Sequence, residues 1–408
     1  MVGLALAAAA PFPAAAAEPA PAESSGTFDR LVGGAARAFT SDNKVFGEVH
    51  LPVIAGNPNS GATYGVLPVW LTHNSRHEIV QIFAPMFTYN RTYGAAFSGT
   101  YYYYPSADVK LRALLEKSER SNWRESLHYD DRKLLDGRAT LLFDANLEAD
   151  GGQQFYGVGP ATRQGDEASE RLLEKELRAE FGVNLEGGFS AAAGWQFRRT
   201  EVQDGPFRTK GLDPSLLTTT TYSLPRVRLS RDTRDLAFTP SQGSLTELFV
   251  EFSRAALGSA SDYEHYGGQW KLYLPTSENL VTAFHAQTDW SGGGNVPFTA
   301  LAQLGGPHSL RGFPEGRFQD RGAAFANVEL RWRVHSIDMV HTMTEFQIAP
   351  FLETGTVFPS PGQAQARYLE TVAGVAFRAV IKPSIVGKVE IGAGREGPAV
   401  FVGIDYPF

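Results

Sequence analysis

The chain has 408 residues, of which 43% are hydrophobic, 12% aromatic and 20% charged. This apolar content argues against global disorder, and the absence of cysteine excludes disulfide scaffolds, thiolate metal sites and cysteine nucleophiles. With 37 basic and 44 acidic residues the net charge is −7, which gives no indication of nucleic-acid binding. The length would suit two or three soluble domains, although a barrel of this size can be a single domain.

Residues 1–17 predict a secretory signal peptide. This apolar stretch ends in consecutive alanines before Glu18, although no Lys or Arg precedes it as in a typical signal. A membrane anchor is the alternative, but Pro11 and Pro13 interrupt a run that is already short for a membrane span. We therefore expect export, with a linker and a short periplasmic segment over residues 18–61.

A two-residue alternation of apolar and polar side chains predicts the architecture. Over residues 324–335 the even positions are apolar and most odd positions are polar or charged, and residues 345–353 and 400–408 follow similar patterns. Such strands have one apolar and one polar face. Because many of these segments reach ten residues and have aromatic residues near their ends, they predict a transmembrane barrel and not a soluble sandwich.

We expect an all-β fold, an antiparallel barrel of about 16 strands over residues 62–408. The alternation gives 17 candidate strands, whereas a closed bacterial barrel normally has an even number. We prefer 16, with 18 as the alternative, and place the surplus segment between residues 107 and 148. Residues 108–120 and 168–180 are rich in helix formers, but the second segment continues an alternating face past Gly182, which favours a strand.

One long connection contains the most informative motif. About thirty residues separate the strand that ends near Trp290 from the strand that begins near Ala323. Connections of that length are usually functional or disordered. Its central residues are Leu310, Arg311, Gly312 and Phe313.

This connection resembles the sixth extracellular loop of the outer-membrane assembly-factor superfamily, which includes BamA, TamA and the two-partner secretion transporters. Phe351, Glu353 and Gly355 resemble the Phe-x-Asp-x-Gly motif of that family, with Glu in place of Asp. Further similar features are residues 231–243, residues 155–159 and the terminal Phe408. About 45 residues between the signal and the first predicted strand would not hold a POTRA repeat, so the chain resembles a barrel-only branch.

The resemblance implies that the loop folds back into the lumen and that Arg311 pairs with the acid at position 353. The alternation agrees, because it places Glu353 on the polar face, where a shielded carboxylate needs a cation or several donors. Gly312 would permit a conformation that larger residues resist, and Phe313 would pack beside the pair. The alternative is that Arg311 is an exposed loop residue.

The C-terminus contains a second predicted signal. Gly403, Tyr406 and Phe408 resemble the sorting signal on the last strand of outer-membrane proteins. Pairing of this strand with residues 62–71 would remove an exposed apolar edge. Pro68 lacks a hydrogen-bond donor, so we expect a weak seam between the two strands.

No catalytic or metal-binding pattern emerges. Residues 188–192 lack the final Gly of a nucleophile elbow. Residues 392–397 match a dinucleotide fingerprint by letters, but a strand follows them where a helix is needed, so we predict a hairpin turn. His73 and His77 lie in a predicted turn and not on one helix face. We expect no enzyme activity, no cofactor and no metal.

These patterns together predict an outer-membrane protein of a Gram-negative bacterium that assists insertion or translocation of proteins or lipids. The alternative is a plugged or passive pore, or a structural barrel without assembly activity. Expected partners are outer-membrane lipid, lipopolysaccharide, the machinery that recognises the C-terminal strand, and protein or lipid clients, but no nucleic acid.

Overall fold

The computed structural model describes residues 40–42, 46–57, 61–75, 78–205, 211–339, 342–381, 385–404 and 408. The predicted signal peptide and the predicted linker as far as residue 39 lie outside these residues. Residues 39–408 belong to one unit, and nearly all of its regular structure is β-sheet. No helix in the described part of the chain is long and apolar enough to cross a membrane.

Nineteen of the described strands form one antiparallel sheet. Its first ten strands are β1 (Thr40–Asp42), β2 (Phe46–Asn57), β3 (Gly61–His73), β4 (Ile79–Asn90), β5 (Gly94–Ser106), β6 (Val109–Ser118), β7 (Trp123–Lys133), β8 (Ala139–Phe155), β9 (Ala168–Asn184) and β10 (Phe189–Asp204). The others are β11 (Thr219–Asp232), β12 (Gly243–Ser253), β13 (Tyr263–Ser277), β14 (Leu280–Gly293), β17 (Gly322–Met339), β18 (Thr342–Phe358), β19 (Glu370–Ile381), β20 (Ile385–Gly394) and β21 (Gly397–Ile404).

The helical segments among the described residues are single turns that connect strands. They are α2 (Leu134–Gly137) and the 3-10 turns Gln164–Asp166, Glu186–Gly188, Pro214–Leu216, Ala255–Leu257, Phe298–Ala300, Pro361–Gln363 and Ala366–Tyr368. The segments that the sequence marked as rich in helix formers are strands, since β6 and β9 occupy them. Alternating burial across a sheet therefore outweighs helix propensity in both places.

The sheet has more strands than the preferred number of 16. Without the three-residue β1, 18 of the 19 strands remain, which is the alternative number. The predicted surplus segment is wrong, because β6, β7 and β8 all belong to the sheet between residues 107 and 148. The predicted boundary at residue 62 is also wrong, because β2 lies upstream of it and pairs with β3 from Phe46 to Asn57.

Side-chain exposure alternates along the strands as a membrane barrel requires. On β17, Leu330 and Trp332 are 42% and 54% exposed, whereas Glu329 and Arg331 are 0% and 2% exposed. On β18, Leu352 is exposed and its neighbour Glu353 is buried. The apolar face of the sheet therefore points outward and the polar face points into the lumen, as in strands of membrane barrels.

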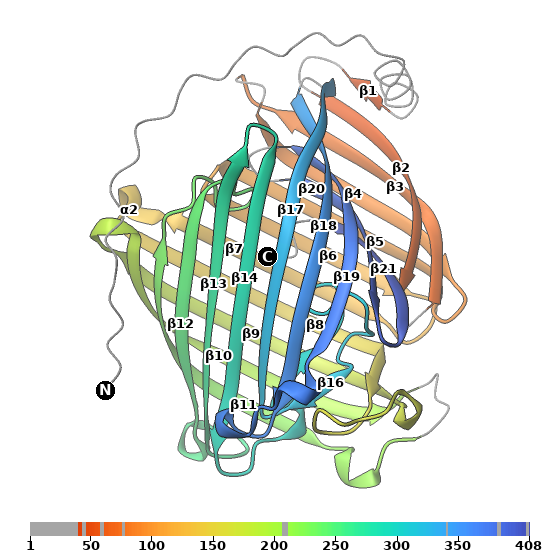
Figure 1. The fold of residues 1–408 in the computed structure, drawn as a ribbon, viewed down its shortest axis with the longest axis vertical. Coiled ribbons are helices and arrows are strands. Elements are labelled where there is room, and N and C mark those ends of the chain that lie inside the picture. Colours follow the sequence, from red (N-terminus) through yellow and green to blue (C-terminus); the bar gives the residue numbers. More distant parts are fainter. Residues whose placement is uncertain are drawn as a thin grey trace. The chain divides into compact units, whose positions relative to one another are not determined.

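Figure 1 shows the sheet curling around so that its first and last long strands come near each other. Cα atoms of β2 and β21 lie within 8 Å, but no strand pairing between them occurs among the described residues. The seam partner of β21 is thus β2, and Pro68 lies one strand further in, on β3. Strand β2 has a proline of its own, Pro52.

The long connection between β14 and β17 is the seventh at its end of the sheet and not the sixth. Connections at this end follow β2, β4, β6, β8, β10, β12 and β14. The predicted barrel of 16 strands lacks β2 and one of the 17 candidate strands. These two strands add one hairpin before the long connection, so its number rises from six to seven.

Candidate functional site in the barrel lumen

The connection between β14 and β17, residues 294–321, folds back inside the curved sheet (Figure 1). It contains two short strands, β15 (Ala302–Leu304) and β16 (Phe318–Asp320), which pair with each other. At its tip Leu310, Arg311 and Phe313 are each 0% exposed. We call this connection the lumenal loop.

Arg311 contacts carboxylates from three different strands. Its Nε lies 2.8 Å from Glu353 on β18, its Nη2 lies 2.9 Å from Glu329 on β17, and its Nη1 lies 2.6 Å from Glu390 on β20. The backbone N–H of Arg311 also donates to Glu353 at 2.6 Å. The guanidinium carbon lies 3.6 Å from the ring centroid of Phe351. Arg311 and Glu353 are therefore in direct contact, as the family resemblance implies.

Three more cations share these carboxylates. Arg378 on β19 forms ion pairs of 2.8 Å with both Glu329 and Glu390. Arg331 lies 3.0 Å from Glu329, and Lys388 lies 3.0 Å from Glu390. We call the whole group the Arg311 cluster; its members, none more than 6% exposed, are Arg311, Glu329, Arg331, Glu353, Arg378, Lys388 and Glu390. Because buried charges are stable only when paired, the cluster ties the lumenal loop to β17, β18, β19 and β20.

Glycines let the loop tip approach the backbone of β20 closely. A Cβ atom on Gly312 would lie 2.5 Å from the backbone nitrogen of Gly394, and one on Gly392 would lie 2.4 Å from the carbonyl oxygen of Arg311. A Cβ on Gly394 would meet the Phe313 ring at 2.6 Å. Close packing is thus the reason for Gly312, and the predicted special conformation is wrong, because Leu310 is the tip residue with a positive φ, 49°.

An apolar core surrounds the ion pairs. The rings of Phe313 and Phe318 pack at right angles with centroids 5.1 Å apart. A Cβ on Gly355 would lie 3.0 Å from Leu304, so this glycine leaves room for the loop. The buried members of the core are Leu304, Leu310, Phe313, Phe318, Ala323, Phe325, Phe351, Val357 and Val372.

Arg317 attaches the other side of the lumenal loop. Its side chain is 0% exposed and forms a 2.7 Å ion pair with Glu396 in the β20–β21 turn. It also donates to the side chain and the carbonyl of Thr162, at 2.9 and 3.0 Å, in the β8–β9 connection. The ring of Tyr156 lies 4.6 Å from its guanidinium carbon. The segment at residues 155–159, which resembles a segment of the family's barrel, therefore lies next to the loop, a contact that the sequence did not predict.

The predicted sorting signal is only partly described. Gly403 lies on β21, which ends at Ile404, and Tyr406 lies outside the described residues. The Phe408 ring stacks on His285 with centroids 5.0 Å apart, and the Arg331 guanidinium carbon lies 4.8 Å from its centroid. His285 and Arg331 belong to the buried, lumenal faces of β14 and β17. The terminal ring therefore faces the lumen in the folded chain.

Sequence reasoning missed Glu329, Glu390 and Arg317. Alternation places Glu329 on the polar face of its strand, but it cannot show that three carboxylates converge on one arginine. Residues 392–397 do contain the predicted hairpin turn, and Gly392, Gly394 and Glu396 within it also contact the lumenal loop. No group of His, Asp or Glu suited to a metal ion occurs in the part of the chain that the structure describes.

The outward apolar face, the polar lumen and the enclosed loop define an outer-membrane type of β-barrel. A family model described as the Omp85 superfamily domain matches residues 109–381, about two thirds of the chain. The chain therefore belongs to the Omp85 superfamily, and the family prediction made from the loop motif is confirmed. No curated protein matches the sequence.

Solved structures resemble this chain at low sequence identity, and one of those below, with a TM-score above 0.5, shares its fold. BamA from Haemophilus ducreyi lacking POTRA domains 1–3 is 13% identical, with a TM-score of 0.53 over 88% of this chain and 74% of that chain. CdiB from Acinetobacter baumannii is 11% identical, with a TM-score of 0.46 over 89% of this chain and 60% of that chain. CdiB from Escherichia coli is 11% identical, with a TM-score of 0.47 over 90% of this chain and 62% of that chain.

Proposed function

We propose that this chain resides in the outer membrane of a Gram-negative bacterium and assists insertion or translocation of proteins or lipids there, without an enzymatic step. The supporting observation is the seam, where β2 and β21 approach each other without strand pairing among the described residues. β1 pairs with β2 only at Gly47–Val49 among the described residues, and the remaining unpaired strand edges offer N–H and C=O groups to an incoming strand. The proposed partners are outer-membrane lipid, lipopolysaccharide, the machinery that recognises the C-terminal strand, and the clients themselves.

The distribution of contacts supports movement of β21 alone. The Arg311 cluster includes residues of β17, β18, β19 and β20, and β21 contributes none. Strand β21 has only 8 residues, whereas β17 and β18 have 18 and 17. Its described pairing is with β20, from Gly387↔Ile404 to Gly394↔Gly397. Displacing this short strand would leave the wall that holds the lumenal loop intact.

Disulfide cross-linking across the seam tests this proposal, because the chain has no cysteine of its own. Val53→Cys on β2 would be combined in turn with Ala399→Cys, Phe401→Cys or Gly403→Cys on β21, which covers the possible registers. Outer-membrane protein and lipid composition would be measured in a deletion strain carrying each variant. We expect the oxidised pair that forms a bond to fail to restore composition, and reductant to recover it.

A matched control places the cross-link between strands that are already paired. Ala326 and Thr354 are direct partners on β17 and β18, so Ala326→Cys with Thr354→Cys should leave function unchanged. Single-cysteine variants control for the substitutions themselves. If the seam cross-link forms and composition is restored as well as by the native chain, the proposal is wrong.

A plugged or structural barrel is the second candidate function. The Arg311 side chain is 0% exposed. This complete enclosure favours the second candidate, because it suits a loop that only stabilises the lumen. Under this alternative, deleting the gene leaves outer-membrane protein and lipid composition unchanged. Steady open channels of the purified barrel in planar bilayers, together with unchanged composition, would select the pore.

A further inference from the structure

The turn between β11 and β12, residues 233–242, is unusually long for its end of the sheet. Other connections at this end are short; residues 278–279 alone join β13 to β14. The turn includes Phe238 and Pro240, and it lies at the end opposite the lumenal loop, because β11 and β14 run in opposite directions. We call it the β11–β12 turn.

Its own hydrogen bonds give this turn a defined shape. The Asp235 carboxylate accepts from the backbone N–H groups of Leu236 and Ser241, both at 2.9 Å. Arg234 donates to Asp232 at 2.6 Å and to the carbonyl of Ala237 at 2.9 Å. The turn is therefore organised by side chains that cap its backbone groups, as Asp commonly does in turns.

The turn contacts strands that lie four to six positions away from β11 along the sheet. The Phe238 ring lies 6.5 Å from the Tyr104 ring on β5, 5.2 Å from Lys110 Nζ on β6 and 5.6 Å from the Arg132 guanidinium carbon on β7. Arg132 also forms a 3.3 Å ion pair with Asp232 at the end of β11. Strands β7 and β11 are four strand spacings apart, about 19 Å along the sheet. The Phe238 contacts reach further, to β5 and β6, so the turn extends inward over the space that these strands and β11 enclose.

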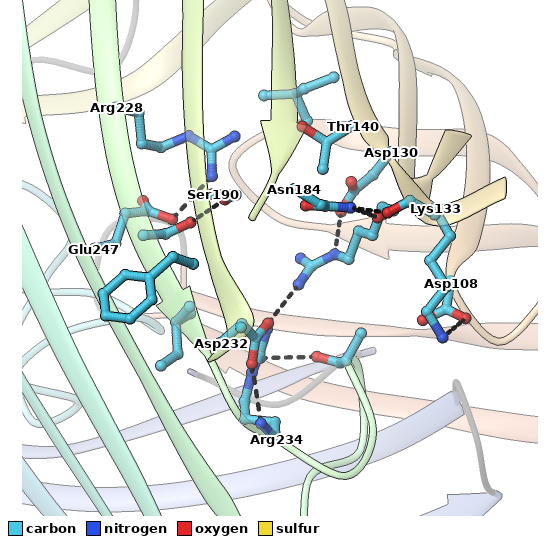
Figure 2. A pocket seen from close by; sticks show the side chains of 18 of the residues that line it. Asp108, Asp130, Lys133, Thr140, Asn184, Ser190, Arg228, Asp232, Arg234 and Glu247 are labelled. Carbon is cyan, nitrogen blue, oxygen red and sulfur yellow. Dashed lines mark hydrogen bonds and ion pairs between the residues drawn. The ribbon is translucent and has the colours of Figure 1, made fainter. Parts of the chain in front are cut away.

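A cavity of about 610 Å³ lies beside the turn. Its lining includes Asp232, Arg234 and Phe238 from the turn region, and residues of β6 through β12 from the wall. Figure 2 shows Asp232 and Arg234 on one side of this space and Asp130 on another, with the Lys133 side chain directed toward Asp108. Most charges around the cavity are already in ion pairs, for example Lys133 with Asp108 at 2.8 Å. The cavity is thus a polar space that the turn bounds, and its charged groups mostly have partners in the protein, unlike the mostly apolar lining of a typical ligand site.

We propose that the β11–β12 turn is a second closure of the lumen, in series with the lumenal loop at the opposite end. Phe238 and the Arg132–Asp232 ion pair hold it against β5, β6 and β7. Because the two closures are in series, moving the turn alone or the lumenal loop alone leaves the lumen blocked by the other. This inference holds whether the barrel acts in assembly or as a pore.

Conductance of the full-length barrel in planar bilayers tests the series arrangement. The turn variant replaces residues 235–241 by two glycines, and the loop variant replaces residues 306–316 by two glycines. Each variant alone should change conductance less than about twofold, and the two combined should raise it about tenfold or more. If the loop variant alone conducts fully and the turn variant adds nothing, or if the turn variant alone conducts fully, the proposal is overturned.

A second measurement avoids any loss of folding caused by the loop variant. Leu142, the fourth residue of β8, lines the cavity, so Leu142→Cys reports access past the turn. A bulky maleimide should label this cysteine about tenfold faster when Phe238→Ala and Arg132→Gln are combined with it. Glu186→Ala, in the β9–β10 turn at the same end, is the matched control and should leave the rate unchanged. Equal labelling in all three backgrounds would contradict a closure by the β11–β12 turn.

Discussion

Two neighbouring regions of the sheet differ sharply in how they are held. Strands β17 to β20 are joined both by continuous pairing and by the Arg311 cluster, whereas β21 and β2 approach each other without pairing in the described part of the chain. Glu390 on β20 is the last cluster member before the seam. The comparison shows that the lumenal loop stabilises the wall beside the seam without bridging the seam itself.

Removing Arg311, the central cation of the Arg311 cluster, should have the largest effect on the stability of strands β17 to β20. Arg311→Ala leaves Glu353 with the hydrogen bond from Asn327 and removes one cation each from Glu329 and Glu390. Breaking one partner of a buried ion pair typically costs about 3–5 kcal/mol. Unfolding of the barrel in urea, followed by heat-modifiable gel mobility, would measure the loss.

The control for this variant is an exposed ion pair at the same end of the barrel. The Arg395 side chain is 53% exposed and lies 2.8 Å from Glu370. Arg395→Ala should lower the free energy of unfolding by about 1 kcal/mol or less. Equal losses from Arg311→Ala and Arg395→Ala would show that burial of the cluster does not matter.

A smaller effect is expected from filling the space between the loop tip and β20. Gly312→Ala would place a Cβ 2.5 Å from the backbone nitrogen of Gly394, so the tip must shift. Overpacking of this kind usually costs about 1–3 kcal/mol. Gly387→Ala on β20 is the control, because no atom lies within 4 Å of its new Cβ. Urea unfolding of both variants would show whether the tip tolerates the methyl group.

Replacing Glu353 by the family's usual aspartate sharpens the account of the cluster. Glu353 accepts from Arg311 at 2.8 Å and from Asn327 at 2.8 Å through the same oxygen. Asp is one methylene shorter, so Glu353→Asp keeps the charge but lengthens these bonds, at a cost of about 1–2 kcal/mol. Glu353→Gln, which removes the charge, should unfold at a lower urea concentration than Glu353→Asp. The reverse order would contradict a role for charge.

The smallest effect concerns the seam. A proline is tolerated in a strand where its missing N–H would face no partner, so Pro52, three residues beyond the last pair of β2 with β1, would suit an edge without a partner strand. Pro52→Ala restores the donor and should change the free energy of unfolding by less than about 0.5 kcal/mol. A stabilisation above about 1 kcal/mol would indicate that β2 gains a hydrogen bond across the seam.

The sequence predicts much of the barrel, because a period of two along a strand is a local property. It gives 17 strands from residue 62 onward, the number from β3 to β21 in the large sheet, and the error lay in discarding one to obtain an even number. The missing strand, β2, has Glu48 and His50 on the same face as the exposed Ile54, which obscures its alternation. With β2, which lies upstream of residue 62, the number of long strands becomes even.

The site is less predictable, because convergence of distant residues is not a local property. The contact between Arg311 and Glu353 follows from a family motif and from alternation. Nothing local indicates that Glu390, 79 positions further along, reaches the same guanidinium, or that Arg317 reaches Thr162, 155 positions earlier. The lumenal position of Phe408 was also not predicted, because the terminal aromatic was interpreted as part of a closing strand.

Hydrogen–deuterium exchange of the folded barrel in lipid nanodiscs tests the contrast between wall and seam most directly. Amides of β21 that do not pair with β20, and those of β2 that pair with neither β3 nor β1, should exchange about a hundredfold faster than the amides of β18. Strand β18 is paired on both sides and holds Glu353. Protection of β21 and β2 equal to that of β18 would mean that a complete ladder joins the two edges, and the account would be wrong.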